Sequence, residues 1–213
     1  MSSSSINRKW ILLQVALLIF LIIILIMPAP RVLGLTYGTG GYGNCQFNTC
    51  GITLSLASGG MNALSITPTS SGSCTIKKES ATIVTGSDTG FSLMLQDGDA
   101  DNSLKTVSGS SIASISGTVA TPTALAVNTW GFRVDGVGGF GVGPTSEVTN
   151  VATPSSLFAA VPLSTGSAAT IAKTAVSTGS TGVTVNTFFG SCIDTSKESG
   201  QYTDAVIFTA IVN

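Results

Sequence analysis

The stretch Trp10–Met27 places the strongest constraint on this chain, because it is an apolar run behind a basic leader. It holds eighteen residues, Gln14 is its only polar residue, and Arg8 and Lys9 precede it with no acidic residue. Export machinery keeps the positive end of such a segment in the cytoplasm and carries the following chain across the membrane. The sequence therefore predicts that everything after this segment folds outside the cytoplasm.

The same segment has two fates that the sequence leaves open, and residues 1–34 are predicted to be either a signal peptide or a transmembrane anchor. Cleavage after Val32-Leu33-Gly34 leaves Leu35 as the first residue, with small or allowed residues at the −3 and −1 positions. Pro28 and Pro30 end the hydrophobic helix where a cleavage region needs an extended chain, which favours the signal peptide. Retention is allowed too, since a membrane span needs about 20 apolar residues and at least ~17.

The exported part of the chain has a low, slightly acidic charge. Without Arg8, Lys9 and Arg31, six of the nine basic residues remain against ten acidic ones, a net charge of −4. Nucleic-acid binding needs Lys and Arg to neutralise phosphates, so nucleic acid is not an expected partner. The chain has no histidine, which excludes a Ser-His-Asp triad and argues against a zinc protease. No pair of carboxylates is marked as a glycosidase acid and base. We therefore predict no enzymatic activity and no cofactor.

Residues 51–213 show the pattern of an all-β domain. Short segments in which apolar residues alternate with Ser and Thr recur about every 8–12 residues, between Gly, Pro and Asp, which is typical of a β-sandwich or barrel. The predicted strands are Ile52–Leu56, Leu64–Ile66, Cys74–Val84, Phe91–Leu95, Thr129–Asp135, Ala169–Val176, Val183–Ile193 and the end of the segment 194–213. The last of these is apolar on both faces, so we expect it to be covered from two sides rather than left as an open edge.

One predicted strand carries the clearest pattern of alternation. Trp130, Phe132 and Val134 fall on one face, which indicates a central strand with the tryptophan in the core. An exposed, ligand-binding tryptophan is the alternative. Arg133, on the other face, is the only arginine after the N-terminal segment, and we expect it to pair with a nearby aspartate. The glycine-rich residues 136–144 follow as a long surface loop, where binding specificity tends to reside.

Alternating aspartates form the only cluster of carboxylates in the sequence. Asp97, Asp99 and Asp101 occupy the first, third and fifth positions of a calcium loop of the EF-hand kind. Asn102 stands where that loop needs glycine, Ser108 stands where it needs glutamate, and the flanks are predicted to be strands rather than helices. We predict a solvated turn whose Asp side chains cap their own backbone, with calcium binding as the alternative.

Four cysteines follow the apolar segment, and outside the cytoplasm an even number favours disulfides. Cys45 and Cys50 are separated by four residues only, so the preferred pairing is Cys45–Cys50 and Cys74–Cys192 among the three that four cysteines allow. A metal site lacks histidine ligands and a second closely spaced cysteine pair. Residues 35–50 are predicted to be a Tyr/Gly-rich linker that ends in the small disulfide loop.

Three segments resemble parts of a β-sandwich family of bacterial cell-surface proteins. They are NTWGFRVDG at 128–136, DTSKESGQYTDAVIFTA at 194–210 and GNCQFNTCGITLS at 43–55. The end of the second segment also resembles the last strand of wall-associated WxL-type and pilus-type domains. The resemblance implies an Ig-like antiparallel β-sandwich and a surface location, and it carries over no catalytic residue. The chain lacks the paired Trp-x-Leu motifs, which leaves peptidoglycan binding without support.

Taken together, the sequence predicts an exported, non-catalytic protein of the cell surface with a structural or adhesive role. One alternative is a pilin-like subunit that polymerises when its terminal strand, or its Tyr-Gly arm, completes a neighbour's sheet. Another is a glycan-binding module that uses Trp130 and the loop 136–144. The expected partners are the membrane, if the N-terminal helix is retained, together with surface glycans or neighbouring copies of the chain.

Overall fold

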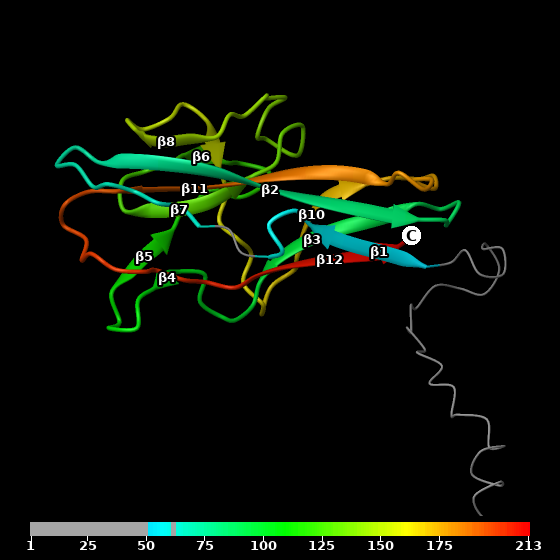
Figure 1. The fold of residues 1–213 in the computed structure, drawn as a ribbon, viewed down its shortest axis with the longest axis horizontal. Helices are drawn as coiled ribbons and strands as arrows, with labels where there is room; N and C mark the ends of the chain where they lie inside the picture. Colours follow the sequence, from blue (N-terminus) through cyan, green and yellow to red (C-terminus); the bar gives the residue numbers. More distant parts are fainter. Residues whose placement is uncertain (1–50, 61–62) are drawn as a thin grey trace, which may run out of the picture. The chain divides into compact units, whose positions relative to one another are not determined.

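The computed structural model describes residues 51–60 and 63–213, and within them it contains strands and no helix (Figure 1). The strands are β1 (Ile52–Leu56), β2 (Ser73–Thr85), β3 (Phe91–Asp97), β4 (Leu104–Lys105), β5 (Ser111–Ser114), β6 (Thr123–Ala124), β7 (Thr129–Arg133), β8 (Val148–Val151), β9 (Leu157–Phe158), β10 (Ala169–Lys173), β11 (Val183–Ile193) and β12 (Val206–Val212). The predicted all-β fold is confirmed for this part of the chain. None of these residues forms a helix that could cross a membrane, and the predicted helix at Trp10–Met27 and linker at 35–50 lie outside them.

Seven strands form the largest sheet, in the order β1-β2-β11-β7-β5-β4, with β8 also paired to β2. The two longest strands, β2 and β11, are antiparallel and pair continuously from Ile83 opposite Val183 to Ser73 opposite Ile193. The β5–β7 pair is parallel, so the sheet is mixed rather than purely antiparallel as predicted. Strand β7 lies between β11 and β5, which confirms the predicted interior position of the Trp130 strand.

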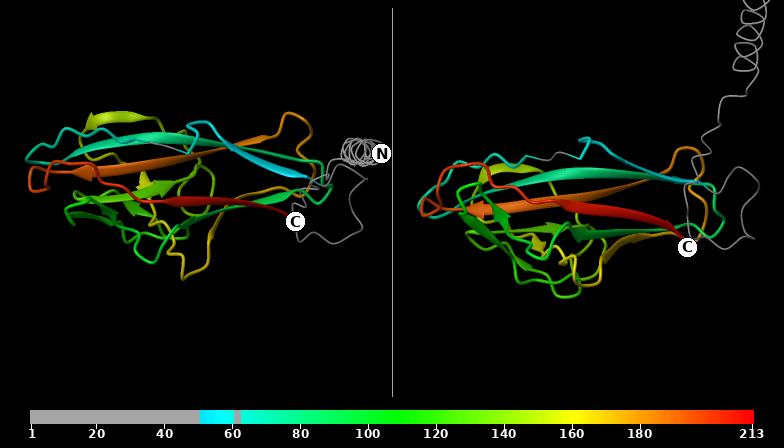
Figure 2. Two further views of the ribbon diagram at one scale, coloured as in Figure 1. Left: turned by 60° about the horizontal axis from the view of Figure 1, so that its bottom comes forward. Right: turned by 90° about the horizontal axis from the view of Figure 1, so that it is seen from below.

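A second sheet has three antiparallel strands in the order β10-β3-β12, and a small third sheet pairs β6 with β9. In Figure 2 the red β12 runs alongside the long strands β2 and β11 without joining their sheet. Strand β12 pairs with β3 along its whole length, from Val206 opposite Asp97 to Val212 opposite Phe91. This register decides which loops meet at the end of β3.

The two larger sheets share one hydrophobic core. Phe91, Leu93 and Leu95 alternate with half-buried residues along β3 and are fully buried, as period-2 alternation predicts. They pack in the same cluster as Ala81 and Ile83, which alternate in the same way along β2. Full burial of each large side chain stabilises the fold by about 1.5–3 kcal/mol, so this core is what holds the sheets together.

The predicted strand Leu64–Ile66 is wrong, because residues 63–68 form no strand. Side chains take the place of a partner strand there. The Thr75 hydroxyl donates to the Ser65 carbonyl at 2.9 Å, and the Thr67 amide donates to Asn150 Oδ1 at 2.7 Å. Apolar alternation over three residues was too short a signal to distinguish a strand from an extended loop of this kind.

The prediction that the terminal strand is covered from two sides is also wrong for the described residues. Strand β12 is the edge of the three-stranded sheet, and β3 is its only paired neighbour there. Val206, Phe208 and Ala210 pack against the core. Ile207 and Ile211 point the other way and are 50% and 46% exposed. The physical reason is that, within residues 51–60 and 63–213, no second layer of strands covers these two side chains.

Candidate functional site

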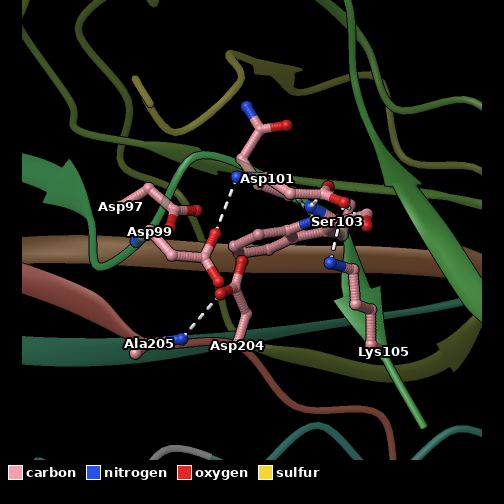
Figure 3. Close-up of polar contacts among 9 residues, drawn as sticks. Asp97, Asp99, Asp101, Ser103, Lys105, Asp204 and Ala205 are labelled. Carbon is pink, nitrogen blue, oxygen red and sulfur yellow. Dashed lines mark hydrogen bonds and ion pairs between the residues drawn. The ribbon is translucent and has the colours of Figure 1, made fainter. Parts of the chain in front are cut away.

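Four aspartates gather where β3 ends and the chain approaches β12 (Figure 3). Asp97 is the last residue of β3, and Asp99 and Asp101 follow it in the loop to β4. Val206 pairs with Asp97, and the Gly98 amide donates to the Ala205 carbonyl at 2.7 Å. This pairing brings Asp204, which is distant in sequence, beside the other three aspartates. We call these four residues the aspartate cluster.

The first three members of the aspartate cluster cap their own backbone, as the sequence predicts. The amide of Asp99 donates to Asp97 Oδ1 at 2.7 Å, and the amide of Asp101 donates to Asp99 Oδ1 at 2.6 Å. Ser103 repeats the pattern, with its amide 3.1 Å from Asp101 Oδ1. These successive turns fix one oxygen of each carboxylate, and the chemistry of the site depends on the other oxygen.

The negative charge of Asp101 is neutralised by a neighbouring lysine. Its Oδ2 lies 2.7 Å from the Lys105 ammonium, in an exposed ion pair. The hydrogen bonds from Lys105 and Ser103 lower the pKa of Asp101 to about 2. This carboxylate is therefore a solvated anion with its own cation, and it needs no further ligand.

Asp97 and Asp204, unlike Asp101, have buried carboxyl oxygens and no lysine or arginine bound to them in the described part of the chain. Asp97 is 1% exposed, and the Oδ2 atoms of both residues are buried with no hydrogen-bond partner in the described part of the chain. The other oxygen of Asp204 accepts the Ala205 amide at 2.7 Å. Burial raises the pKa of Asp204 to about 7, and the negative charge of Asp97, a side-chain hydrogen bond with Asp97 and the charge of Asp99 act in the same direction. The carboxyl groups of Asp97 and Asp204 are thus close enough to share a proton, and neither Oδ2 has a partner elsewhere among the described residues.

The aspartate cluster borders an open depression of about 410 Å³. Its lining residues are Gly98, Asp99, Asp101, Ser103, Lys105, Thr203, Asp204 and Ala205. As the side chains stand, no three carboxylate or thiol groups within residues 51–60 and 63–213 are arranged to hold a metal ion. Sequence reasoning found Asp97, Asp99 and Asp101 but missed Asp204, since nothing local marks a residue that joins the cluster only through strand pairing.

Arg133 has the aspartate partner that the sequence predicts, and that partner is Asp135. Arg133 Nε lies 2.8 Å from Asp135 Oδ1, and Asp135 Oδ2 accepts the Thr145 amide at 2.7 Å. Arg133 Nη1 donates to the carbonyl of Phe140. Phe140 is itself buried and packs edge-on against Phe132, with ring centroids 5.7 Å apart. The glycine-rich loop 136–144 is therefore anchored to the core at its centre, which the sequence did not indicate.

Trp130 is buried at 3% exposure, and its indole donates to the Asn102 carbonyl at 2.8 Å. The predicted core position is confirmed, and the alternative of an exposed, ligand-binding tryptophan is wrong. The only hydrogen-bond donor of the ring is used inside the domain. A glycan site that stacks a sugar on Trp130 therefore has no support from this structure.

Cys74 and Cys192 form a disulfide between directly opposite residues of β2 and β11, with a Cα–Cα distance of 4.0 Å. Both cysteines are fully buried. Cys45 and Cys50, the other predicted pair, lie outside the described residues. A disulfide is consistent with a protein that matures in an oxidising compartment.

Comparisons of the chain with protein-family models, with curated proteins and with solved structures give no match. The resemblance to bacterial surface β-sandwich proteins therefore stays a prediction.

Proposed function

We propose that this chain is an exported, non-catalytic cell-surface protein in which residues 51–213 form an Ig-like β-sandwich with a structural or adhesive role. The observation that carries the proposal is the buried Cys74–Cys192 disulfide. Such bonds persist in oxidising compartments and are rare in the cytoplasm. The disulfide lies downstream of the apolar segment Trp10–Met27, and it supports export independently of that segment.

The placement of the disulfide supports the proposed structural role. It joins the two longest strands, which lie next to each other in the interior of the larger sheet. Part of the outer face of the same strands is neutral: Ser80 Oγ lies 2.8 Å from Asn186 Oδ1, and the hydroxyls of Thr82 and Thr184 are 3.1 Å apart. Lys78 is the exposed charged residue of β2. This rigid face of hydroxyl and amide groups suits a protein that persists at a surface.

Isolation of the protein from its own cells tests this proposal. We expect it in the envelope or external fraction, beginning at Leu35 or retaining Met1, with Cys74 and Cys192 resistant to alkylation in denaturant until a reductant is added. Recovery from the cytoplasmic fraction with both thiols free would contradict the proposal. The N-terminal residue also decides between the signal peptide and the anchor.

A second candidate function is self-association by strand addition, and strand β12 favours it. The Ala205 carbonyl and the Asn213 amide bond to β3 and its turn. Because bonding alternates along an antiparallel strand, the backbone groups of Val206, Phe208, Ala210 and Val212 face away from β3. Strand β1 contacts β12 from the other sheet without pairing with it. This edge and the exposed Ile207 and Ile211 form a surface that a strand from a second copy could extend.

A further inference from the structure

We propose that Asp97, Asp99 and Asp204 of the aspartate cluster form a binding site for a divalent cation that prefers hard oxygen ligands, and that this cation is calcium. The inference goes beyond the proposed surface role and does not depend on it. It rests on two buried oxygens with no partner outside the Asp97–Asp204 pair, on carboxylates that are each fixed through one oxygen, and on an excess of acidic groups.

The buried oxygens are the first observation. Asp97 is 1% exposed, and neither its Oδ2 nor Asp204 Oδ2 has a hydrogen-bond partner among residues 51–60 and 63–213. A buried charged oxygen without a partner is strongly unfavourable, and nearly all such atoms in native proteins are satisfied by protein, water or an ion. Because Asp97 and Asp204 are within side-chain hydrogen-bonding reach of each other, either a shared proton or a cation has to lie between the two carboxyl groups, and in the proposed site calcium takes this place.

The second observation is that a backbone amide fixes one oxygen of each of the three carboxylates. In each, Oδ1 accepts an amide: Asp99 donates to Asp97 at 2.7 Å, Asp101 to Asp99 at 2.6 Å, and Ala205 to Asp204 at 2.7 Å. These bonds leave Oδ2 of each carboxylate available for a ligand. Figure 3 shows the carboxylates of Asp97, Asp99 and Asp204 gathered on the same side of the loop.

The third observation is the balance of charge. In the described part of the chain, Lys105 is the one cation in contact with the cluster, and its ammonium lies 2.7 Å from Asp101 Oδ2. Asp97, Asp99 and Asp204 thus have no counter-ion bound to them among the described residues, and a cation that displaces the proton of Asp204 removes the repulsion among the three carboxylates. Asp101 is left out of the proposed ligand set because Lys105 already neutralises it.

Calcium fits this arrangement better than magnesium does. Calcium takes six to eight oxygen ligands in irregular geometry, whereas magnesium demands a near-ideal octahedron. As the structure stands, the three carboxylates are not arranged to hold an ion. Binding therefore requires the exposed Asp99 side chain to turn its free oxygen toward Asp97 and Asp204, and water in the open depression completes the shell.

The test uses the full chain stripped with a chelator, followed by thermal unfolding and calorimetric titration with calcium chloride. At about one hundred times the dissociation constant, calcium should raise Tm by roughly 5–10 °C. Asp204→Asn should abolish this increase, and Asp99→Asn should weaken calcium binding at least tenfold. Asp88→Asn, at an exposed turn away from the cluster, is the matched control and should respond like the unaltered protein.

Two outcomes would overturn the proposal. One is an unaltered protein whose Tm is the same in calcium and in chelator and which shows no binding heat. The other is an equal calcium response in Asp204→Asn and Asp88→Asn. If Asp204→Asn does not fold, calcium titration of the unaltered protein and of Asp99→Asn still tests the proposal. Asp99 is exposed, so we expect the Asp99→Asn variant to fold. An Asp204→Asn variant that is more stable than the unaltered protein, with no calcium binding in either, would show that the pair shares a proton instead.

Discussion

Gly131 of β7 lies directly opposite Gly190 of β11, and neither position has room for a side chain. A Cβ on Gly190 would meet the Phe158 ring at 2.8 Å, and one on Gly131 would meet the Ala159 carbonyl at 2.6 Å. The paired glycines let residues 157–161 cross close to the sheet, where Phe132 and Ala159 exchange two backbone hydrogen bonds of 2.9 Å.

Gly190→Ala should therefore destabilise the domain by overpacking. Phe158 is fully buried and cannot move away freely, so we expect a loss of about 1–3 kcal/mol in the free energy of unfolding. Urea unfolding followed by tryptophan fluorescence measures it. Gly51→Ala is the control, because nothing lies within 4 Å of its Cβ position. Equal stability of the two variants would contradict this account of the crossing.

Removal of the disulfide should have a larger effect. Cys74 and Cys192 are separated by 118 positions, and the chain-entropy model assigns a closed loop of that size about 4–5 kcal/mol. The double variant Cys74→Ala with Cys192→Ala should lose that amount relative to the oxidised protein. On addition of reductant, the midpoint of its unfolding in denaturant should also change far less than the midpoint of the unaltered protein. A midpoint equal to that of the oxidised protein would contradict the prediction.

The Arg133–Asp135 ion pair should make stability depend on acid pH. Burial opposes ionisation of Asp135, but the hydrogen bonds from Thr145 and Arg133 outweigh it and lower its pKa below 3.8. A carboxyl with a lowered folded-state pKa stabilises the fold above its unfolded pKa, and this contribution is lost as pH falls through the folded value. We expect Asp135→Asn to lose stability near neutral pH and to show a weaker dependence between about pH 5 and pH 2.

Denaturant unfolding at a series of pH values measures this difference. Asp88→Asn serves as the control, since Asp88 is exposed in a turn. Parallel stability curves for Asp135→Asn and the unaltered protein across the acid range would exclude Asp135 as the source of the dependence.

If β12 mediates self-association, replacing its exposed apolar side chains should prevent it. Ile207→Lys with Ile211→Lys puts charges beside an open strand edge, which natural proteins use to block edge-to-edge pairing. Sedimentation should then show a monomer where the unaltered protein forms larger species that increase with concentration. Val107→Lys is matched in chemistry, because Val107 is a fully exposed apolar residue outside β12, and it should leave association unchanged. A monomeric unaltered protein at high concentration would exclude the mechanism.

The sequence predicted the long, alternating strands well and the relations between distant segments poorly. Strand β11 begins and ends as predicted, because Gly182 precedes it, its first residues alternate, and β-branched and aromatic residues dominate it. Asp204 could not be placed with Asp97, since strand pairing alone brings the two together. The exposure of Ile207 was also hidden from sequence, because a strand that is apolar on both faces has the same pattern whether or not a second layer covers it.

The position of the disulfide also determines how this domain responds to mechanical pulling at its two ends. Cys74 and Cys192 lie near the start of β2 and the end of β11, so the covalent bond bypasses everything between them. Tension applied through β1 and β12 can draw out only the segments outside the bond. The segment between the two cysteines spans 118 positions, which is roughly 400 Å of extended chain. Force cannot extend this segment until the disulfide is reduced.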